Sequence, residues 1–159
     1  LAAHDGVEGL ALIEQERPDL VIFNIMLPRL DGWDLLRRVR EHKTLANLPM
    51  VILTTRCSAE DTITGWRLGA DEYIIDPTSP LALVKTVEQV LNRNLEERRS
   101  YRKLLLERGM LLKRLRESAP PGIEITGLRL LRGGEKKLGE LISAADYAVA
   151  FVVAQGNGD

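Results

Sequence analysis

The chain has 159 residues, a formal net charge of -1 and 45% hydrophobic residues, which leaves room for one complete domain and part of another. A net charge so close to zero indicates no global electrostatic attraction to nucleic acid or to a membrane, and neither partner is expected. The single cysteine excludes an internal disulfide and suits a reducing compartment. No apolar run approaches the roughly 20 residues that span a bilayer, so a cytoplasmic protein is expected.

Strands and helices are predicted to alternate along the first part of the chain. Residues 1–6 have the pattern of a strand end that turns into a short amphipathic helix, and an apolar strand begins at Leu20. Asp31 is placed to cap a second helix, and Ser58 is placed to cap a third helix after the strand at 49–55. Helices of this length between strands predict an α/β fold, with a parallel sheet covered on both faces.

A long helix is predicted to close this part of the chain. Helix-forming sequence begins near Ser79 or Pro80 and continues to about Glu117. Residues 96–117 carry an apolar stripe at spacings of three, four and seven, interrupted in one register by Arg98 and Arg108 and weakened by Gly109. Two interpretations remain open for this stripe: a coiled-coil seam that joins two copies of the chain, or a single helix that packs on its own domain.

One segment has the pattern of a reactive strand end. Residues 20–32 read LVIFNIMLPRLDG, in which a buried strand ends at the polar residue Asn24. Open α/β sheets place their chemistry at such carboxyl ends. This segment resembles the phosphoacceptor segment of bacterial response-regulator receiver domains, with Asn24 at the position of the phosphorylated aspartate. An asparagine amide has no anionic oxygen to attack a phosphoryl donor, so phosphorylation at Asn24 is not expected.

The resemblance to receiver domains covers about residues 1–95 and implies a flavodoxin-like fold. Thr54 stands where the family keeps the hydroxyl that follows the phosphoryl group, and Tyr73 matches the aromatic residue that swings inward with it. In the sequence IIDP, Asp76 replaces the lysine that precedes a cis-proline in the family. A carboxylate at that position repels the phosphoryl anion that the lysine would bind. The resemblance therefore implies two retained switch residues and two lost reactive residues.

The first strand of the receiver fold, which carries the acidic residues that bind Mg²⁺, is not found before Leu1. In the receiver strand order 2-1-3-4-5 that strand is central, so its neighbours would each gain an unpaired edge. Leu1 is interpreted as a truncation, as a boundary, or as a place where another chain or segment supplies a strand. No metal ligand is assigned and no cofactor is expected, since Mg²⁺ is implied only for an intact receiver.

The remaining residues, 118–159, suggest a small β-rich tail that belongs to a partial output domain. One resemblance is to metal-dependent serine/threonine phosphatases, in which Glu135 and Gln155 would take the places of metal-binding aspartates. A second resemblance is to the end of a GGDEF diguanylate cyclase, in which Ala150 and Val153 replace a tyrosine and a lysine. Neither resemblance retains the residues of an active site, so no enzyme activity is expected.

Together these observations predict a pseudo-receiver (1–95), a helical linker (96–117) and a partial output domain (118–159). The predicted function is bacterial two-component signalling through protein contacts, with a protein partner and a homodimer through the long helix. The face made by the fourth helix, fifth strand and fifth helix of the receiver fold, which carries Arg67 and Lys85, is the predicted contact surface. A receiver-regulated phosphatase or cyclase is the alternative.

Overall fold

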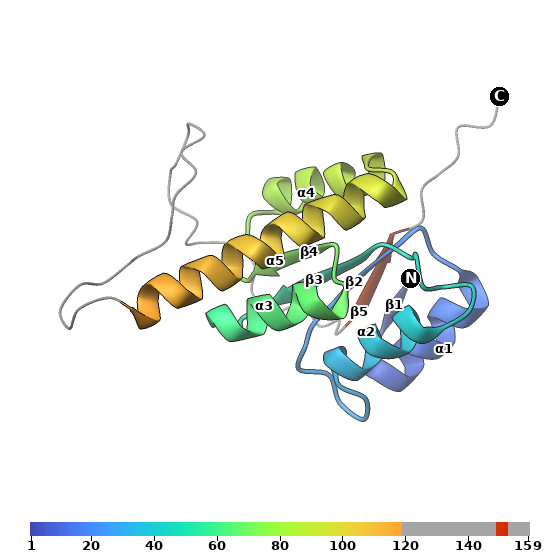
Figure 1. Ribbon diagram of the computed structural model, residues 1–159. Helices are drawn as coiled ribbons and strands as arrows, with labels where there is room; N and C mark the ends of the chain where they lie inside the picture. The colour runs from blue at the N-terminus through green and yellow to red at the C-terminus, as the bar shows by residue number, and fades with distance from the viewer. Residues whose placement is uncertain (119–148, 153–159) are drawn as a thin grey trace.

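The computed structural model describes residues 1–118 and 149–152, in which strands and helices alternate as expected of an α/β fold (Figure 1). In chain order the elements are β1 (Ala2–Ala3), α1 (Gly6–Glu16), β2 (Leu20–Phe23), α2 (Gly32–Glu41), β3 (Met50–Thr54), α3 (Ala59–Leu68), β4 (Glu72–Ile75), α4 (Pro80–Asn92), α5 (Leu95–Glu117) and β5 (Val149–Val152).

Two hydrophobic cores lie on opposite faces of the sheet. Successive side chains of a strand point to opposite faces, and β2 shows this directly: Val21 and Phe23 join the larger core, whereas Leu20 and Ile22 join the smaller one. The larger core is completed mainly by α1 and α2, and the smaller core by Val87 and Val90 of α4. The sheet is therefore covered on both faces, as the sequence pattern predicts.

The sheet has the strand order β1-β5-β2-β3-β4. Strands β2, β3 and β4 are parallel, whereas β5 pairs antiparallel with both β1 and β2. Thus Val149–Val152, which the sequence analysis assigned to the tail, supplies a strand at the position where the receiver fold has its first strand. Its antiparallel direction was not predicted. It is compatible with the fold because the backbone N–H and C=O groups of β1 and β2 that face β5 can pair with a strand of either direction.

The predicted helix caps are confirmed at two positions. The Asp31 carboxylate accepts a hydrogen bond from the Asp34 backbone N–H at 2.8 Å and starts α2. The Ser58 hydroxyl accepts one from the Asp61 backbone N–H at 3.0 Å and starts α3. Each cap satisfies a backbone donor that has no partner inside the first helical turn. The start of α3 directly after β3 is therefore defined by local sequence.

Helix α5 packs along α3 of the same chain (Figure 1). At Gly109 the helices approach closely, since a Cβ built there would lie 3.1 Å from both Ile63 and Trp66. This is the arrangement that the sequence analysis kept as the alternative to a coiled-coil seam. Leu104, Leu111 and Leu115 remain exposed on α5, and association of two copies through this helix stays a prediction. Among the described residues, no helix is both long enough and apolar enough to cross a membrane.

The amino-terminal half of α5 is held by a buried carboxylate, Asp71, whose side chain is 1% exposed. Its oxygens bind the guanidinium group of Arg40 from α2 at 3.0 Å and that of Arg98 from α5 at 3.3 Å. The Arg102 guanidinium lies 3.9 Å away, and the backbone N–H of Met50 donates to the same carboxylate at 2.9 Å. We call Asp71, Arg40, Arg98 and Arg102 the arginine cluster.

The arginine cluster joins elements that are far apart in the sequence. Arg40 and Arg102 also donate to the backbone oxygen of Gly69, which ends α3, at distances of 2.6 to 2.9 Å. Arg98 donates to the backbone oxygen of Asn47 at 2.9 Å. The guanidinium groups are therefore both paired with a carboxylate and hydrogen-bonded to backbone oxygens. The cluster ties α2, the end of α3, β4 and α5 together.

Replacement of Asp71 by asparagine is expected to lower the free energy of unfolding by about 3 to 5 kcal/mol, because it leaves buried guanidinium groups without their counter-charge. Urea unfolding followed by circular dichroism measures this change. Asp34→Asn is the matched control, since Asp34 pairs with Arg37 at the surface, and its cost should stay below about 1 kcal/mol. Equal costs for the two variants would contradict a central role for the arginine cluster.

Candidate functional site

The candidate site lies at the carboxyl ends of β2, β3 and β4. Thr54 is the last residue of β3 and pairs in register with Ile75 of β4, and Asp76 follows directly. The backbone N–H of Asp76 donates to the backbone oxygen of Thr54 at 2.8 Å. Asn24 follows Phe23, which pairs with Ile52 of β3. The structure therefore brings all three predicted positions to one edge of the sheet, which is where parallel strands present their chemistry.

Asn24 is engaged with its own loop. Its side-chain oxygen accepts a hydrogen bond from the backbone N–H of Met26 at 3.1 Å. On the other side, Gly32 at the start of α2 packs so closely that a Cβ there would lie 2.4 Å from the Asn24 backbone oxygen. The amide carries no charge and no nucleophilic oxygen, so its chemistry here is that of a hydrogen-bonding loop residue.

Asp76 places a carboxylate at the site. The Asp76–Pro77 peptide bond is cis, as the resemblance to receiver domains implies. One carboxylate oxygen, Oδ1, is buried and has no hydrogen-bond partner within the described part of the chain. A carboxylate can accept hydrogen bonds or bind cations, whereas it repels anions. This position therefore disfavours a phosphoryl group.

Thr54 and Tyr73 are both buried and both bind the backbone of one residue, Arg56. The Thr54 hydroxyl oxygen accepts a hydrogen bond from the Arg56 backbone N–H at 3.3 Å. The Tyr73 hydroxyl donates to the Arg56 backbone oxygen at 2.9 Å. The two switch-type residues are thus linked through a single peptide segment. Sequence reasoning missed Arg56, because nothing in the sequence shows that a loop backbone will receive both hydroxyl groups.

The inward position of Tyr73 depends on a glycine in α3. A Cβ built at Gly65 would lie 2.9 Å from the Tyr73 ring and 3.0 Å from the side chain of Ile52. Since nearly any other residue would push the ring away, Gly65 provides the space that the ring occupies. The signal in the sequence was a glycine within a helical pattern, which often has a packing reason.

The Tyr73 phenol is held in its neutral form. Burial raises its pKa to about 12, the nearby Asp61 carboxylate adds to this effect, and the Arg56 guanidinium opposes it. Burial raises the pKa because the charged phenolate loses more hydration than the neutral phenol does. Tyr73 therefore remains a hydrogen-bond donor to Arg56 at every physiological pH.

The described residues contain no large cluster of metal ligands. Within 1–118 and 149–152, no group of three or more His, Cys, Asp or Glu side chains is placed to hold a metal ion. Mg²⁺ is usually bound through one or two carboxylates, with water and phosphate oxygens completing an octahedron. Asn24 and Asp76 do not supply the acidic pair that the receiver resemblance implies. No chemical step is therefore assigned to a metal.

Several solved structures are similar to this chain. A putative response regulator from Chloroflexus aurantiacus matches with a TM-score of 0.55 and 36% identity over 57% of this chain and 75% of that one. The receiver domain of RstA from Klebsiella pneumoniae, described as BeF3-activated, matches with a TM-score of 0.53 and 32% identity over 58% of this chain and 77% of that one. These similarities support the flavodoxin-like fold.

Curated relatives are named as transcriptional regulators. YclJ from Bacillus subtilis is 40% identical in an aligned region that covers 57% of this chain and 38% of YclJ. AfsQ1 from Streptomyces coelicolor is 31% identical over 89% of this chain and 62% of that protein. The expectation that nucleic acid is not a partner is therefore wrong. It rested on the global charge of -1, and a global charge says nothing about a local surface or an attached output region.

The stability of the fold is expected to fall as the pH rises from about 10 to about 12, in part because of Tyr73. The folded state binds the phenol proton more tightly than the unfolded chain, so the stabilisation is complete below the ordinary pKa and is lost as the pH rises through the raised one. Urea unfolding of the native chain and of Tyr73→Phe over this range isolates the phenol. Identical pH dependence of the two chains would exclude this contribution.

The model of the family described as "Response regulator receiver domain" matches residues 1–88, which are more than half of the chain. The strands β2, β3 and β4 carry the acceptor-equivalent, hydroxyl and lysine-equivalent positions at one edge, in the arrangement that the resemblance implies. This chain belongs to the response-regulator receiver domain family of two-component signalling proteins.

Proposed function

We propose that this receiver domain acts as a pseudo-receiver, which takes part in signalling through protein contacts and is not phosphorylated at its acceptor position. The observation that carries the proposal is Asn24. Its neutral amide occupies the end of β2, and its oxygen accepts a hydrogen bond from Met26. An amide cannot form the acyl phosphate that an aspartate forms. The protein is proposed to work in the cytoplasm and to be neither an enzyme nor dependent on a cofactor.

Asp76 supports the same proposal through its charge. Phosphoryl groups in proteins are bound by cations and by hydrogen-bond donors. Here the position that follows β4 carries a carboxylate, one of whose oxygens is buried. The repulsion between this carboxylate and a phosphoryl group would oppose both formation and retention of a phosphorylated state. Two independent substitutions therefore act against phosphorylation.

The arrangement of Thr54 and Tyr73 is compatible with control by a partner. Both hydroxyl groups bind the Arg56 backbone, so in this structure the loop after β3 is tied to both residues without a phosphoryl group. A protein partner could change this conformation only if it bound two conformations with different affinities. The proposed contact face consists of α3, β4 and α4. It exposes Ile75, Leu81 and Val84, whose exposed fractions are 48%, 65% and 52%.

Intact mass spectrometry after incubation with acetyl phosphate and Mg²⁺ tests the proposal. The native chain is expected to gain no phosphoryl mass, because Asn24 offers no nucleophile and Asp76 repels the product. The double variant Asn24→Asp, Asp76→Lys is the matched control, since it restores both reactive residues. A phosphoryl mass on the native chain would refute the pseudo-receiver proposal, and peptide mapping would then identify the acceptor.

A second candidate function is control of transcription by a longer protein that contains this receiver. It is favoured by the similarity to AfsQ1, which extends over 144 residues and so beyond the receiver family match at 1–88. The phosphatase alternative rests on a sequence resemblance at Glu135 and Gln155, which lie outside the described residues. The cyclase alternative rests on a resemblance at Ala150 and Val153, of which Ala150 lies in β5 and Val153 lies outside the described residues. The names of the relatives favour transcriptional regulation over either enzyme.

Selection of random duplex DNA on the whole chain tests this second candidate. If these residues bind DNA specifically, we expect certain sequences to be enriched. Their affinity for the protein should fall steeply as the salt concentration rises, because contacts to DNA phosphates release counterions. Binding of the enriched and starting pools should then differ at equal ionic strength. Equal binding of the two pools would count against specific recognition of DNA by these residues.

A further inference from the structure

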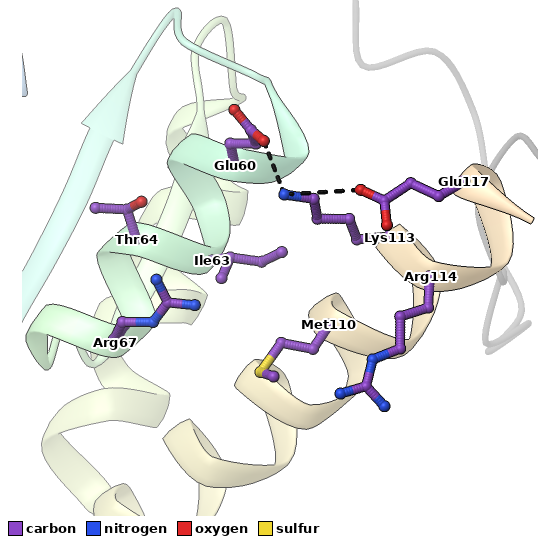
Figure 2. Close-up of a pocket in the computed structure, with 8 residues that line it drawn as sticks. All are labelled: Glu60, Ile63, Thr64, Arg67, Met110, Lys113, Arg114 and Glu117. Carbon is purple, nitrogen blue, oxygen red and sulfur yellow. Dashed lines mark hydrogen bonds and ion pairs between the residues drawn. The ribbon is translucent and has the colours of Figure 1, made fainter.

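A groove lies between α3 and α5, and none of the residues that line it belongs to the candidate site at the carboxyl ends of the strands. Its volume is about 410 Å³. In Figure 2 it is lined by side chains that come from the two facing helices, and we call it the α3–α5 groove. The α3 helix contributes Ile63, Thr64 and Arg67, and the α5 helix contributes Met110, Lys113 and Arg114.

The charges at one end of the groove already have partners within the protein. The Lys113 ammonium lies 2.8 Å from the carboxylate of Glu60 and 3.8 Å from that of Glu117 (Figure 2). One cation is thus shared between two carboxylates. This end of the groove has a local charge near -1 and needs no external anion.

The other end of the groove carries two cations that have no counter-charge in the part of the chain that the structure describes. The guanidinium groups of Arg67 and Arg114 make no hydrogen bond or ion pair among the described residues. They come from different helices and lie on either side of Met110 in Figure 2. A guanidinium group offers several donors in a fixed plane that matches a carboxylate. This end of the groove therefore combines positive charge with an apolar side chain.

We propose that the α3–α5 groove binds an acidic, amphipathic peptide segment of a protein partner. Carboxylates of the segment would pair with Arg67 and Arg114, and an apolar side chain would cover Met110. This inference deepens the proposed function, on which it rests, because it gives the chemistry of a partner for a receiver that works through protein contacts.

A peptide fits this surface better than the phosphate backbone of a nucleic acid does. Nucleic-acid backbones are bound by runs of cations along a face. On α5, Arg98 and Arg102 are instead held by the buried Asp71, and Lys113 is held between two glutamates. Arg67 and Arg114, which have no ion pair within 1–118 and 149–152, lie beside an apolar side chain. This combination matches alternating acidic and apolar residues, because each type of residue then finds its complement.

Selection of phage-displayed random dodecapeptides on the native chain, with no phosphoryl donor present, tests this inference. The recovered peptides are expected to be enriched in Asp or Glu alternating with Leu, Ile or Phe. Fluorescence anisotropy with the best synthetic peptide should then show about tenfold weaker binding to the Arg67→Glu, Arg114→Glu variant, since exposed charge pairs contribute modest energies that add.

The matched control is the Arg38→Glu, Lys43→Glu variant, which changes the net charge equally at exposed residues outside both the groove and the proposed contact face. It should bind the selected peptide as the native chain does. No acidic enrichment, or equal weakening by both double variants, would overturn the inference. Self-association of the native chain at the groove, detected as a dimer that Arg67→Glu, Arg114→Glu abolishes, would also overturn it. Phosphorylation of the native chain would refute only the proposed function on which it rests, so the two failures are distinguishable.

Discussion

The placement of α5 depends on the burial of one carboxylate. Asp71 begins the segment that enters β4, and its oxygens bind arginines of α2 and α5. A carboxylate with a 1% exposed side chain would be very unfavourable alone, so the arginines must stay close to it. Since Arg98 and Arg102 lie on α5, this requirement fixes the start of that helix against the domain. The remaining contacts of α5 with α3, including the close approach at Gly109, follow from that anchor.

The helix α3 lies between the candidate site and α5, and glycines allow close packing on both of its sides. Gly65 of α3 accommodates the Tyr73 ring, and Gly109 of α5 accommodates Ile63 and Trp66 of α3. Closely packed elements deform little and tend to move as rigid bodies. A shift of α3 would therefore displace both the Tyr73 ring and α5. The Tyr73 hydroxyl in turn binds the Arg56 backbone, which also binds Thr54. The site edge and the long helix thus share one structural element.

Local sequence predicted the elements better than it predicted their contacts. The caps at Asp31 and Ser58, the alternation of strands and helices and the helix end at Glu117 all rest on neighbouring residues, and the structure has them. The prediction of one helix from Ser79 or Pro80 to Glu117 is wrong, because Asn94 and Glu97 form a capping box that starts a second helix. Arg98 was interpreted as an interruption of an apolar stripe, yet it is buried against Asp71. Gly109 was interpreted as a weak point, yet it is where α5 meets α3. Periodicity identifies a face of a helix but not the element that the face meets.

The loss of the acceptor carboxylate changes what can supply the energy for switching. A phosphoryl group shifts a receiver only because it binds one conformation better than another. Under the proposed pseudo-receiver function, Asn24 and Asp76 remove that ligand. A two-state domain responds only to a ligand with different affinities for its two states, however tightly the ligand binds. A protein that contacts α3 would satisfy this condition by binding α3 more tightly when the Tyr73 ring packs against Gly65 than when the ring is displaced. By linkage, a partner that prefers the inward arrangement of Thr54 and Tyr73 would stabilise it to the same extent that this arrangement favours the partner.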